Sequence, residues 1–153
     1  MPSDPVFLKA YKALATKIAA DYSSGYSGLY MTATGRVIRG IIPEAPILPF
    51  ASIFFVETSE SAGPVLTRYS GTMTFEIYAF AGGDTITERA DAAVRLGADM
   101  MNAINTDRSL GLAGAIDDVV CNFTHLEGDR IGVPHAGVAF VQALVTFQSD
   151  RGV

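Results

Sequence analysis

The chain has 153 residues, a length typical of one domain, so we expect residues 1–153 to form a single domain. Hydrophobic residues make up 49% of it and charged residues 18%, which is apolar for a protein that stays alone in water and indicates surface buried in an assembly. The net charge of −5 argues against a module that grips nucleic acid, because such a module would carry a basic patch.

No stretch approaches the ~20 apolar residues of a membrane span, and the polar N-terminus predicts no signal peptide. The single cysteine, Cys121, excludes an intrachain disulfide framework and fits a reducing compartment.

Charge is unevenly distributed along the chain. Residues 1–43 hold five basic and two acidic residues, a net of +3, so residues 44–153 carry the remaining −8.

The first predicted element is a helix over residues 4–22. Asp4 suits the N-cap and Pro5 suits the first helical position. A stripe of large side chains follows at helical spacing: Phe7, Tyr11, Leu14, Ile18 and Tyr22. Three lysines lie off this stripe, which predicts a helix with one face buried against a sheet. A helix lying on a membrane would need a higher density of cations.

The segment from residue 23 to residue 50 is mostly irregular. Serine and glycine predict a loop over residues 23–35, and residues 36–42 predict a short strand. Three prolines between residues 43 and 49 then impose an extended path. Residues 51–58 predict a strand that is apolar on both faces, which places it centrally in a sheet or at an interface.

The strongest signal is a strand, a glycine turn and a long helix over residues 68–105. Residues 68–81 alternate with the period of a strand, and Thr85 and Glu88 have the spacing of a capping box. The residues expected on the buried stripe of the helix are Ile86, Ala90, Ala93, Val94, Gly97, Met101 and Ile104, whereas Glu88, Arg89, Asp91, Arg95 and Asp99 are expected to point away. The small residues should let this helix lie close to the sheet.

Two more strands complete the predicted sheet. Residues 116–126 predict a strand with Val119, Cys121 and Phe123 on one face, and residues 137–148 form the most regular strand pattern of the chain. The pattern predicts an α/β (α+β) sandwich. Its mixed or mainly antiparallel sheet would have about four to five strands, packed by the N-terminal helix and the long central helix. Hairpins around residues 59–67 and 127–136 are expected to extend as arms that reach neighbouring molecules.

The search for reactive groups finds little. His125, Glu127 and Asp129 alternate and could share a strand face as metal ligands, but a polar strand end is the better interpretation. Asp117 and Asp118 are adjacent, so on a strand they would point to opposite faces and make a poor acid–base pair. No phosphate-binding glycine loop and no nucleophile elbow is present. We therefore expect no catalytic, cofactor or metal site and predict that the protein is not an enzyme.

Surface residues are the remaining candidates for function. Four aromatic residues are expected on the sheet face away from the long helix: Phe54, Tyr78, Phe80 and Phe140. They would be core if the N-terminal helix covers that face, and a partner-binding patch if it does not. Together with hairpin residues, the candidate interface consists of Phe54, Glu60, Tyr69, Tyr78, Phe80, Asp129, Arg130 and Phe140.

The order of the elements resembles the tail terminator proteins of long-tailed phages. The resemblance is carried by the N-terminal helix, the proline-rich lead into a strand, the long hairpin, the capped helix over residues 85–105, and a closing strand that ends near Gln148. The segment most like a sequence motif of that family is the turn Asp107-Arg-Ser-Leu-Gly111 after that helix. The segment over residues 23–50 is longer than in the more compact members.

This resemblance implies a homohexameric ring, assembled in the host cytoplasm, at the head-proximal end of the virion tail. The ring would stop polymerisation of the tail tube and offer a surface to the head–tail connector. Its partners would be copies of itself, the tail tube protein and the connector or neck protein. DNA would pass through the lumen without specific binding, repelled by acidic residues for which the candidates are Glu57, Glu60, Glu76, Glu127 and Asp129.

Three other interpretations stay open. One is a different head–tail joining or tail-completion protein of the neck on the same fold. Another is a small-ligand-binding or enzymatic α+β domain, which would show a buried polar pocket around His125 or His135. The third is a regulatory adaptor, monomeric or dimeric, that uses an exposed sheet edge.

Overall fold

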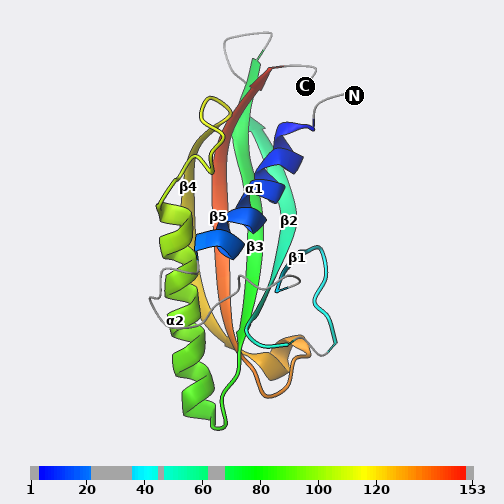
Figure 1. The fold of residues 1–153 in the computed structure, drawn as a ribbon. Helices are drawn as coiled ribbons and strands as arrows, with labels where there is room; N and C mark the ends of the chain where they lie inside the picture. Colours follow the sequence, from blue (N-terminus) through cyan, green and yellow to red (C-terminus); the bar gives the residue numbers. More distant parts are fainter. Residues whose placement is uncertain (1–3, 22–35, 45–46, 62–67, 151–153) are drawn as a thin grey trace.

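The computed structural model describes residues 4–21, 36–44, 47–61 and 68–150 (Figure 1). Its elements are α1 (Val6–Asp21), β1 (Val37–Arg39), β2 (Phe50–Ser61), β3 (Arg68–Ala81), α2 (Ile86–Asn105), β4 (Ile116–Glu127), the short 3-10 helix η2 (Gly128–Ile131) and β5 (Gly137–Asp150). The predicted α+β sandwich with two helices and a mixed five-stranded sheet is confirmed. The loop predicted over residues 23–35, Tyr22, and the tip of the hairpin at 62–67 lie outside the described residues.

The strand order in the sheet is β1-β2-β3-β5-β4. β1 runs parallel to β2, and all other neighbouring strands are antiparallel. β3 is central and pairs with β5 along all 14 of its residues. These two strands run almost the full length of the molecule in Figure 1. The stretch with the strongest sequence signal is thus the axis of the fold.

Both helices cover the same face of the sheet (Figure 1). One continuous core contains Val6, Ala10, Leu14 and Ile18 of α1, Leu96, Met100 and Ile104 of α2, and Met73, Phe75, Ile77 and Ala79 of β3. The Tyr11 hydroxyl at the side of α1 donates to the Ile53 carbonyl of β2 at 2.6 Å. α1 therefore packs beside α2, and neither of these two helices covers the opposite face of the sheet.

The start of α2 is the predicted capping box. The Thr85 hydroxyl accepts the Glu88 backbone N–H at 3.1 Å, and the Glu88 carboxylate accepts the Thr85 backbone N–H at 3.2 Å. Two backbone donors that an uncapped helix leaves unpaired are thereby satisfied.

The predicted buried stripe of α2 was partly wrong. Ile86 and Val94 are 66% and 47% exposed, and Asp99, expected to point outwards, is buried. The residues that are buried in α2 are Ala93, Leu96, Gly97, Asp99, Met100, Ala103 and Ile104. α2 thus faces the core with a stripe centred on Leu96 and Met100, and it lies close to β4, because a Cβ on Gly97 would be only 2.3 Å from Cε2 of Phe123.

The turn after α2 is tied together by one carboxylate. Asp107 accepts hydrogen bonds from the Ser109 backbone N–H at 3.0 Å, the Ser109 hydroxyl at 2.6 Å and the Gly111 backbone N–H at 2.9 Å. These bonds favour the charged form and hold the pKa of Asp107 below its ordinary value. They close the turn in which Leu110 and Gly111 adopt positive φ angles of 54° and 72°. The Asp107-to-Gly111 motif is thus a carboxylate-closed turn.

The connection over residues 127–136 is compact, so the prediction of an extended arm there was wrong. Val133 and Ala136 are buried in a second hydrophobic cluster with Phe50, Phe80 and Val138, on the face opposite the helices. The Gly128 backbone N–H donates to the Ala136 carbonyl at 3.0 Å, which closes the loop. In the hairpin between β2 and β3, the described strand continues to Ser61, beyond the predicted end at residue 58.

Candidate interaction surface

The sheet face away from both helices can be described row by row from the strand register. Across β2, β3, β5 and β4, the rows are Phe50–Phe80–Val138–Leu126, then Ser52–Tyr78–Phe140–Thr124, then Phe54–Glu76–Gln142–Asn122, then Glu57–Thr74–Leu144–Val120, and then Ser59–Thr72–Thr146–Asp118. We call the last four rows the open face. Its composition changes from aromatic at one end to small and polar at the other.

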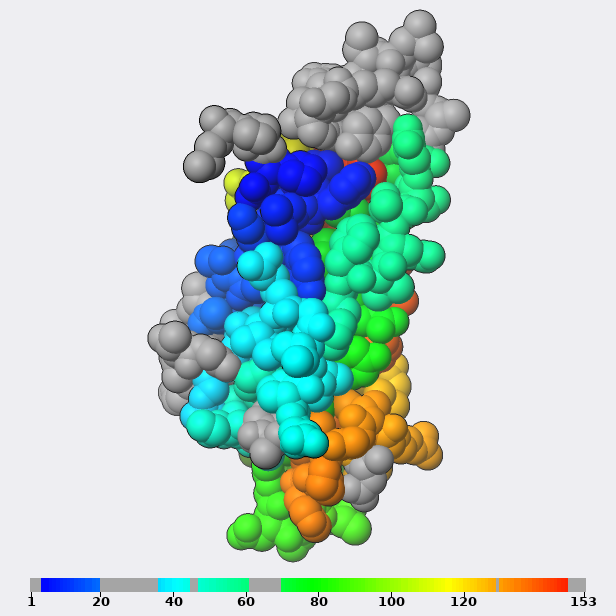
Figure 2. Space-filling view, turned by 90° about the vertical axis from the view of Figure 1, so that its right-hand side faces the viewer, coloured from blue at the N-terminus to red at the C-terminus, as the bar shows by residue number. Residues whose placement is uncertain are grey.

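The first row is closed by the chain itself. Phe80 is fully buried and Phe50 is 4% exposed, because Val133 and Ala136 pack over them. Leu48 contributes partly buried area to the same cluster. Figure 2 shows the segments around residues 36–44 and 131–137 side by side at this end of the molecule. Phe80, a predicted interface residue, therefore packs inside the subunit and presents no surface to a partner.

The centre of the open face is an aromatic cluster formed by Phe54, Tyr78 and Phe140. The ring centroids of Phe54 and Tyr78 are 5.7 Å apart, and those of Tyr78 and Phe140 are 5.0 Å apart. All three side chains are partly exposed, and the nearby Val120 is 47% exposed. From the sequence, these three aromatic residues could belong either to the core or to the surface. They belong to the surface, because α1 packs on the other face of the sheet.

A carboxylate lies beside this aromatic cluster. The Tyr78 hydroxyl donates to Glu76 at 3.1 Å. Partial burial raises the pKa of Tyr78, and the negative charge of Glu76 and the hydrogen bond to it raise it further. Glu57 lies on the same face, because a bulge between Phe55 and Glu57 shifts the register so that Glu57 pairs with Thr74. The open face thus combines an apolar centre with three acidic residues, Glu57, Glu76 and Asp118.

The five acidic residues predicted to line a lumen do not form one patch. Glu57 and Glu76 lie on the open face, whereas Glu60 pairs with Gly71 on the helix side of the sheet. Glu127 lies at the opposite end, since its partner Gly137 pairs with Ala81. Gly71 and Ala81 are ten positions apart along β3, which corresponds to about 33 Å.

The remaining predicted interface residues are only partly described. The side chains of Tyr69 and Asp129 lie outside the described part of the structure. Arg130 is exposed in η2, at the same end as Glu127 and far from Glu60. The structure therefore brings together Phe54, Tyr78 and Phe140 but separates Arg130 from them.

A similar fold occurs in a gene transfer agent particle. The match is to a chain of a structure described as "Virion of native gene transfer agent (GTA) particle", with a TM-score of 0.54. It covers 90% of this chain and 93% of that chain at 8% sequence identity, so the likeness is one of fold. Neither a protein-family model nor a curated protein sequence matches this chain.

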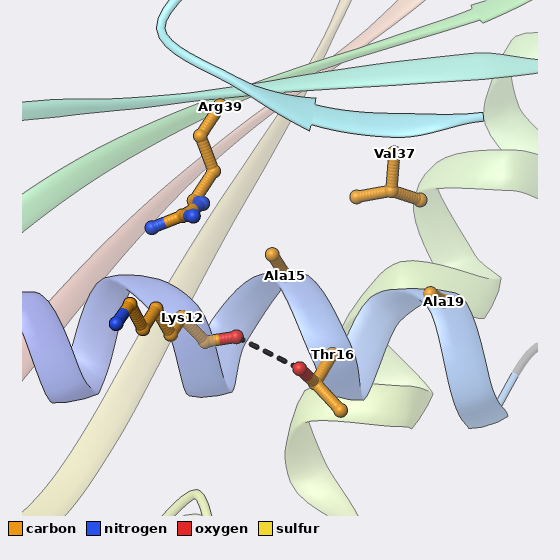
Figure 3. A pocket seen from close by; sticks show the side chains of 6 residues that line it. All are labelled: Lys12, Ala15, Thr16, Ala19, Val37 and Arg39. Atoms are coloured by element: carbon orange, nitrogen blue, oxygen red, sulfur yellow. Dashed lines mark hydrogen bonds between the residues drawn. The ribbon is translucent and has the colours of Figure 1, made fainter. Parts of the chain in front are cut away.

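The helix side of the molecule carries a basic surface that the sequence analysis did not single out. Figure 3 shows a pocket of about 400 Å³ between α1 and β1, lined by Lys12, Ala15, Thr16, Ala19, Val37 and Arg39. The Arg39 guanidinium lies 5.2 Å from the centroid of the Tyr11 ring, and Lys12 pairs with Asp4 at 2.5 Å. The net charge of +3 on residues 1–43 was the signal in the sequence for this surface.

An apolar hollow lies next to this basic surface. It has a volume of about 340 Å³, lies between α1 and β2, and is lined by Pro5, Phe7, Leu8, Tyr11, Phe55 and Thr58. Phe55 is 38% exposed at its edge. Figure 2 shows the side of the molecule on which α1, the segment around residues 36–44 and the outer edge of β2 meet.

The residues considered for chemistry take separate structural roles. The Asp117 carboxylate accepts from Gln148 at 2.9 Å, and the Asp118 carboxylate accepts from Arg108 at 2.7 Å. His125 has a buried Nε2 atom without a hydrogen-bond partner among the described residues. Within those residues, no group of three or more His, Cys, Asp or Glu side chains is placed to hold a metal ion.

The Cys121 thiol and the lengths of the helices bear on two of the sequence predictions. Burial raises the pKa of the Cys121 thiol to about 11, since the thiolate would lose its hydration. Neither described helix is long and apolar enough to cross a membrane.

Proposed function

We propose that this protein is a structural component of a phage-like virion and has no catalytic role. In this proposal, residues 1–153 form one tail-terminator-like domain. Six copies form a ring at the head-proximal end of the tail, stop polymerisation of the tail tube and present a docking surface to the head–tail connector. The observation that carries the proposal is the fold shared over 90% of the chain with a component of a gene transfer agent virion.

The surface of the subunit supports an assembled state. The aromatic cluster of Phe54, Tyr78 and Phe140 lies on a sheet face that neither α1 nor α2 covers, and its three side chains are partly exposed. Burying such a face against a neighbouring molecule is favourable, because apolar surface leaves water. A ring offers that burial to every copy, since each subunit has a neighbour on both sides.

The charge of the chain supports a lumen through which DNA passes. Six copies with a net charge of −5 each carry −30, and a lumen of that sign would repel DNA. Because the predicted lumen residues are divided between two ends of the sheet, we propose that either Glu60 or Glu127 lines the lumen with its neighbours. Glu60→Lys and Glu127→Lys should then differ in their effect on DNA ejection, and equal, unaltered ejection would contradict the lumen proposal.

The first test of the ring is the native mass of the purified chain over a wide range of concentration. Six copies of 16.2 kDa predict a species of about 97 kDa. If the chain remains a monomer, the next test is addition to isolated tail tubes, because the tube can act as a template for ring closure. A chain that neither forms a ring nor caps tubes would end the proposal.

Deletion of the gene distinguishes the terminator from a neighbouring neck protein on the same fold. Loss of a terminator removes the stop on the tube, so we expect tails longer than normal in electron micrographs. Loss of another head–tail joining protein predicts tails of normal length without heads. Complementation with the wild-type gene is the control, and it should restore particles of normal length in either case.

A further inference from the structure

The two faces of the subunit have complementary surfaces. We propose that the contact between copies is head-to-tail, with the open face of one copy packed on α1 and β1 of the next copy. This inference rests on the proposed function, because it specifies which surfaces join the subunits of the ring.

The first support is charge. α1 and β1 together carry the basic residues Lys9, Lys12, Lys17 and Arg39 and the acidic Asp21, a net of +3. The four rows of the open face carry the acidic residues Glu57, Glu76 and Asp118 and no basic residue, a net of −3. Opposite charges on the two surfaces favour their association and disfavour contact of each surface with its own copy.

The second support is the apolar centre of each surface. On the sheet, Phe54, Tyr78 and Phe140 are bordered by Glu57 and Glu76. On the helix side, the apolar hollow with Phe7, Leu8 and Phe55 lies beside the basic surface, and Tyr11 belongs to both because Arg39 lies over its ring. An apolar centre with a charged border is the usual organisation of a protein interface.

The third support is the position of the surfaces on the subunit. Arg39 pairs in register with Ile53, whose side chain is in the core beneath α1, so Arg39 belongs to the helix side. The aromatic cluster lies on the other side of the same sheet. Two complementary surfaces on opposite faces cannot satisfy each other in a twofold dimer, but they can in a head-to-tail array that closes into a ring.

Some charges on these surfaces already have partners within the chain. Lys12 pairs with Asp4, Glu76 accepts from Tyr78, and Asp118 pairs with Arg108. The test therefore leaves the ion-paired Lys12 and Asp118 unchanged. It reverses Lys9 and Arg39 on one surface and Glu57 and Glu76 on the other, all of which have at least partly exposed side chains; the partner of Glu76 is a neutral hydroxyl and not a charge.

The experiment uses two variants of the full chain. Variant one carries Lys9→Glu and Arg39→Glu, and variant two carries Glu57→Lys and Glu76→Lys. Each places like charges across every contact, so we expect each alone to need at least tenfold more protein than wild type to form the ring. In an equimolar mixture both kinds of contact between different variants are attractive, so the mixture should form rings of alternating copies.

Four controls make the result decisive. Arg95→Glu and Asp91→Lys each reverse one charge at an exposed position of α2, half the change in each test variant, and each should leave assembly at its wild-type concentration. A chain that carries all four substitutions restores opposite charges and should assemble on its own. Raising the salt concentration should weaken assembly of the wild type, because these charges lie at the border of the interface. Thermal unfolding of each variant checks that it is folded.

The outcomes separate this inference from the proposed function. If wild type forms a ring and the two variants form it equally well, or if the mixture fails to recover it, the head-to-tail contact is refuted and the ring remains. If wild type stays a monomer at every concentration, wild type and the two variants are compared for capping of tail tubes. Equal capping by wild type and by each variant alone refutes the contact, whereas failure of wild type to cap refutes the proposed function.

Discussion

The close contact between Gly97 and Phe123 leads to a quantitative prediction about stability. In an exposed helix interior, replacing glycine with alanine gains about 1 kcal/mol from helix propensity. Here the new Cβ would lie 2.3, 2.6 and 2.8 Å from three atoms of the Phe123 ring. Overpacking of this kind typically costs about 1–3 kcal/mol. The two effects together predict that Gly97→Ala lowers the free energy of unfolding by about 1 kcal/mol.

A double-mutant cycle measures the contact directly. Phe123→Leu removes the ring, so in that background Gly97→Ala should be neutral or stabilising by up to about 1 kcal/mol. The free energy of unfolding is measured by urea denaturation, and the midpoint of thermal unfolding should fall by about 2–4 °C for the single Gly97→Ala change. Ala98→Gly, at an exposed position of the same helix, measures the propensity effect alone. A coupling energy below about 0.5 kcal/mol would refute the reasoning, because it would mean that the ring moves aside freely.

Three other predictions concern single side chains. Thr85→Ala should lower the free energy of unfolding by about 1 kcal/mol because it removes the capping box, whereas Thr87→Ala in the same turn should change it little. The hydrogen bonds to Asp107 depress its pKa, so they stabilise the fold above the ordinary carboxyl pKa, and that stability is lost as the pH falls through the pKa of the folded state. Asp107→Asn should therefore make the free energy of unfolding less dependent on pH in acid. An unchanged dependence on acid pH in this variant would contradict the prediction. With a pKa of about 11, Cys121 is a thiolate in only roughly 1 molecule in 1,000 at pH 8, so a thiol reagent should modify it far faster in urea than in the folded protein.

The sequence predicted those elements whose signals are local. The start of α2 followed from Thr85 and Glu88, since a capping box depends only on residues within one turn. The alternating pattern of residues 68–81 and 137–148 predicted β3 and β5, because a strand with one face in the core repeats every second residue.

Features that depend on distant parts of the chain were not predictable in the same way. The apolar stripe of α1 indicated burial but could not indicate which face of the sheet it covers. α2 has apolar residues on several sides, so its local pattern could not show that Leu96 and Met100 face the core while Ile86 and Val94 are exposed. The bulge after Phe55 puts Glu57 on the open face, whereas strict alternation along the strand would put Glu57 on the same face as Ile53 and Phe55.

The candidate surface was predicted in part for the same reason. Phe54, Tyr78 and Phe140 have the right alternation to share a face, and the structure places them together. Phe80 has the same alternation but is buried by Val133, a residue more than fifty positions away in the sequence. Periodicity shows which residues share a face, whereas the fold of the connecting segments determines which of them remain accessible.

β4 lies at the edge of the sheet, and the placement of its charges has a consequence for the free protein. An unpaired strand edge of 12 residues is a template on which other chains can form fibrils. Acidic residues stand at both ends of β4, with Asp117 and Asp118 at one end and Glu127 at the other. Two copies of β4 aligned along their full length would bring acid against acid in either direction. Two β4 edges therefore repel each other, and this repulsion helps keep the subunits dispersed until they assemble.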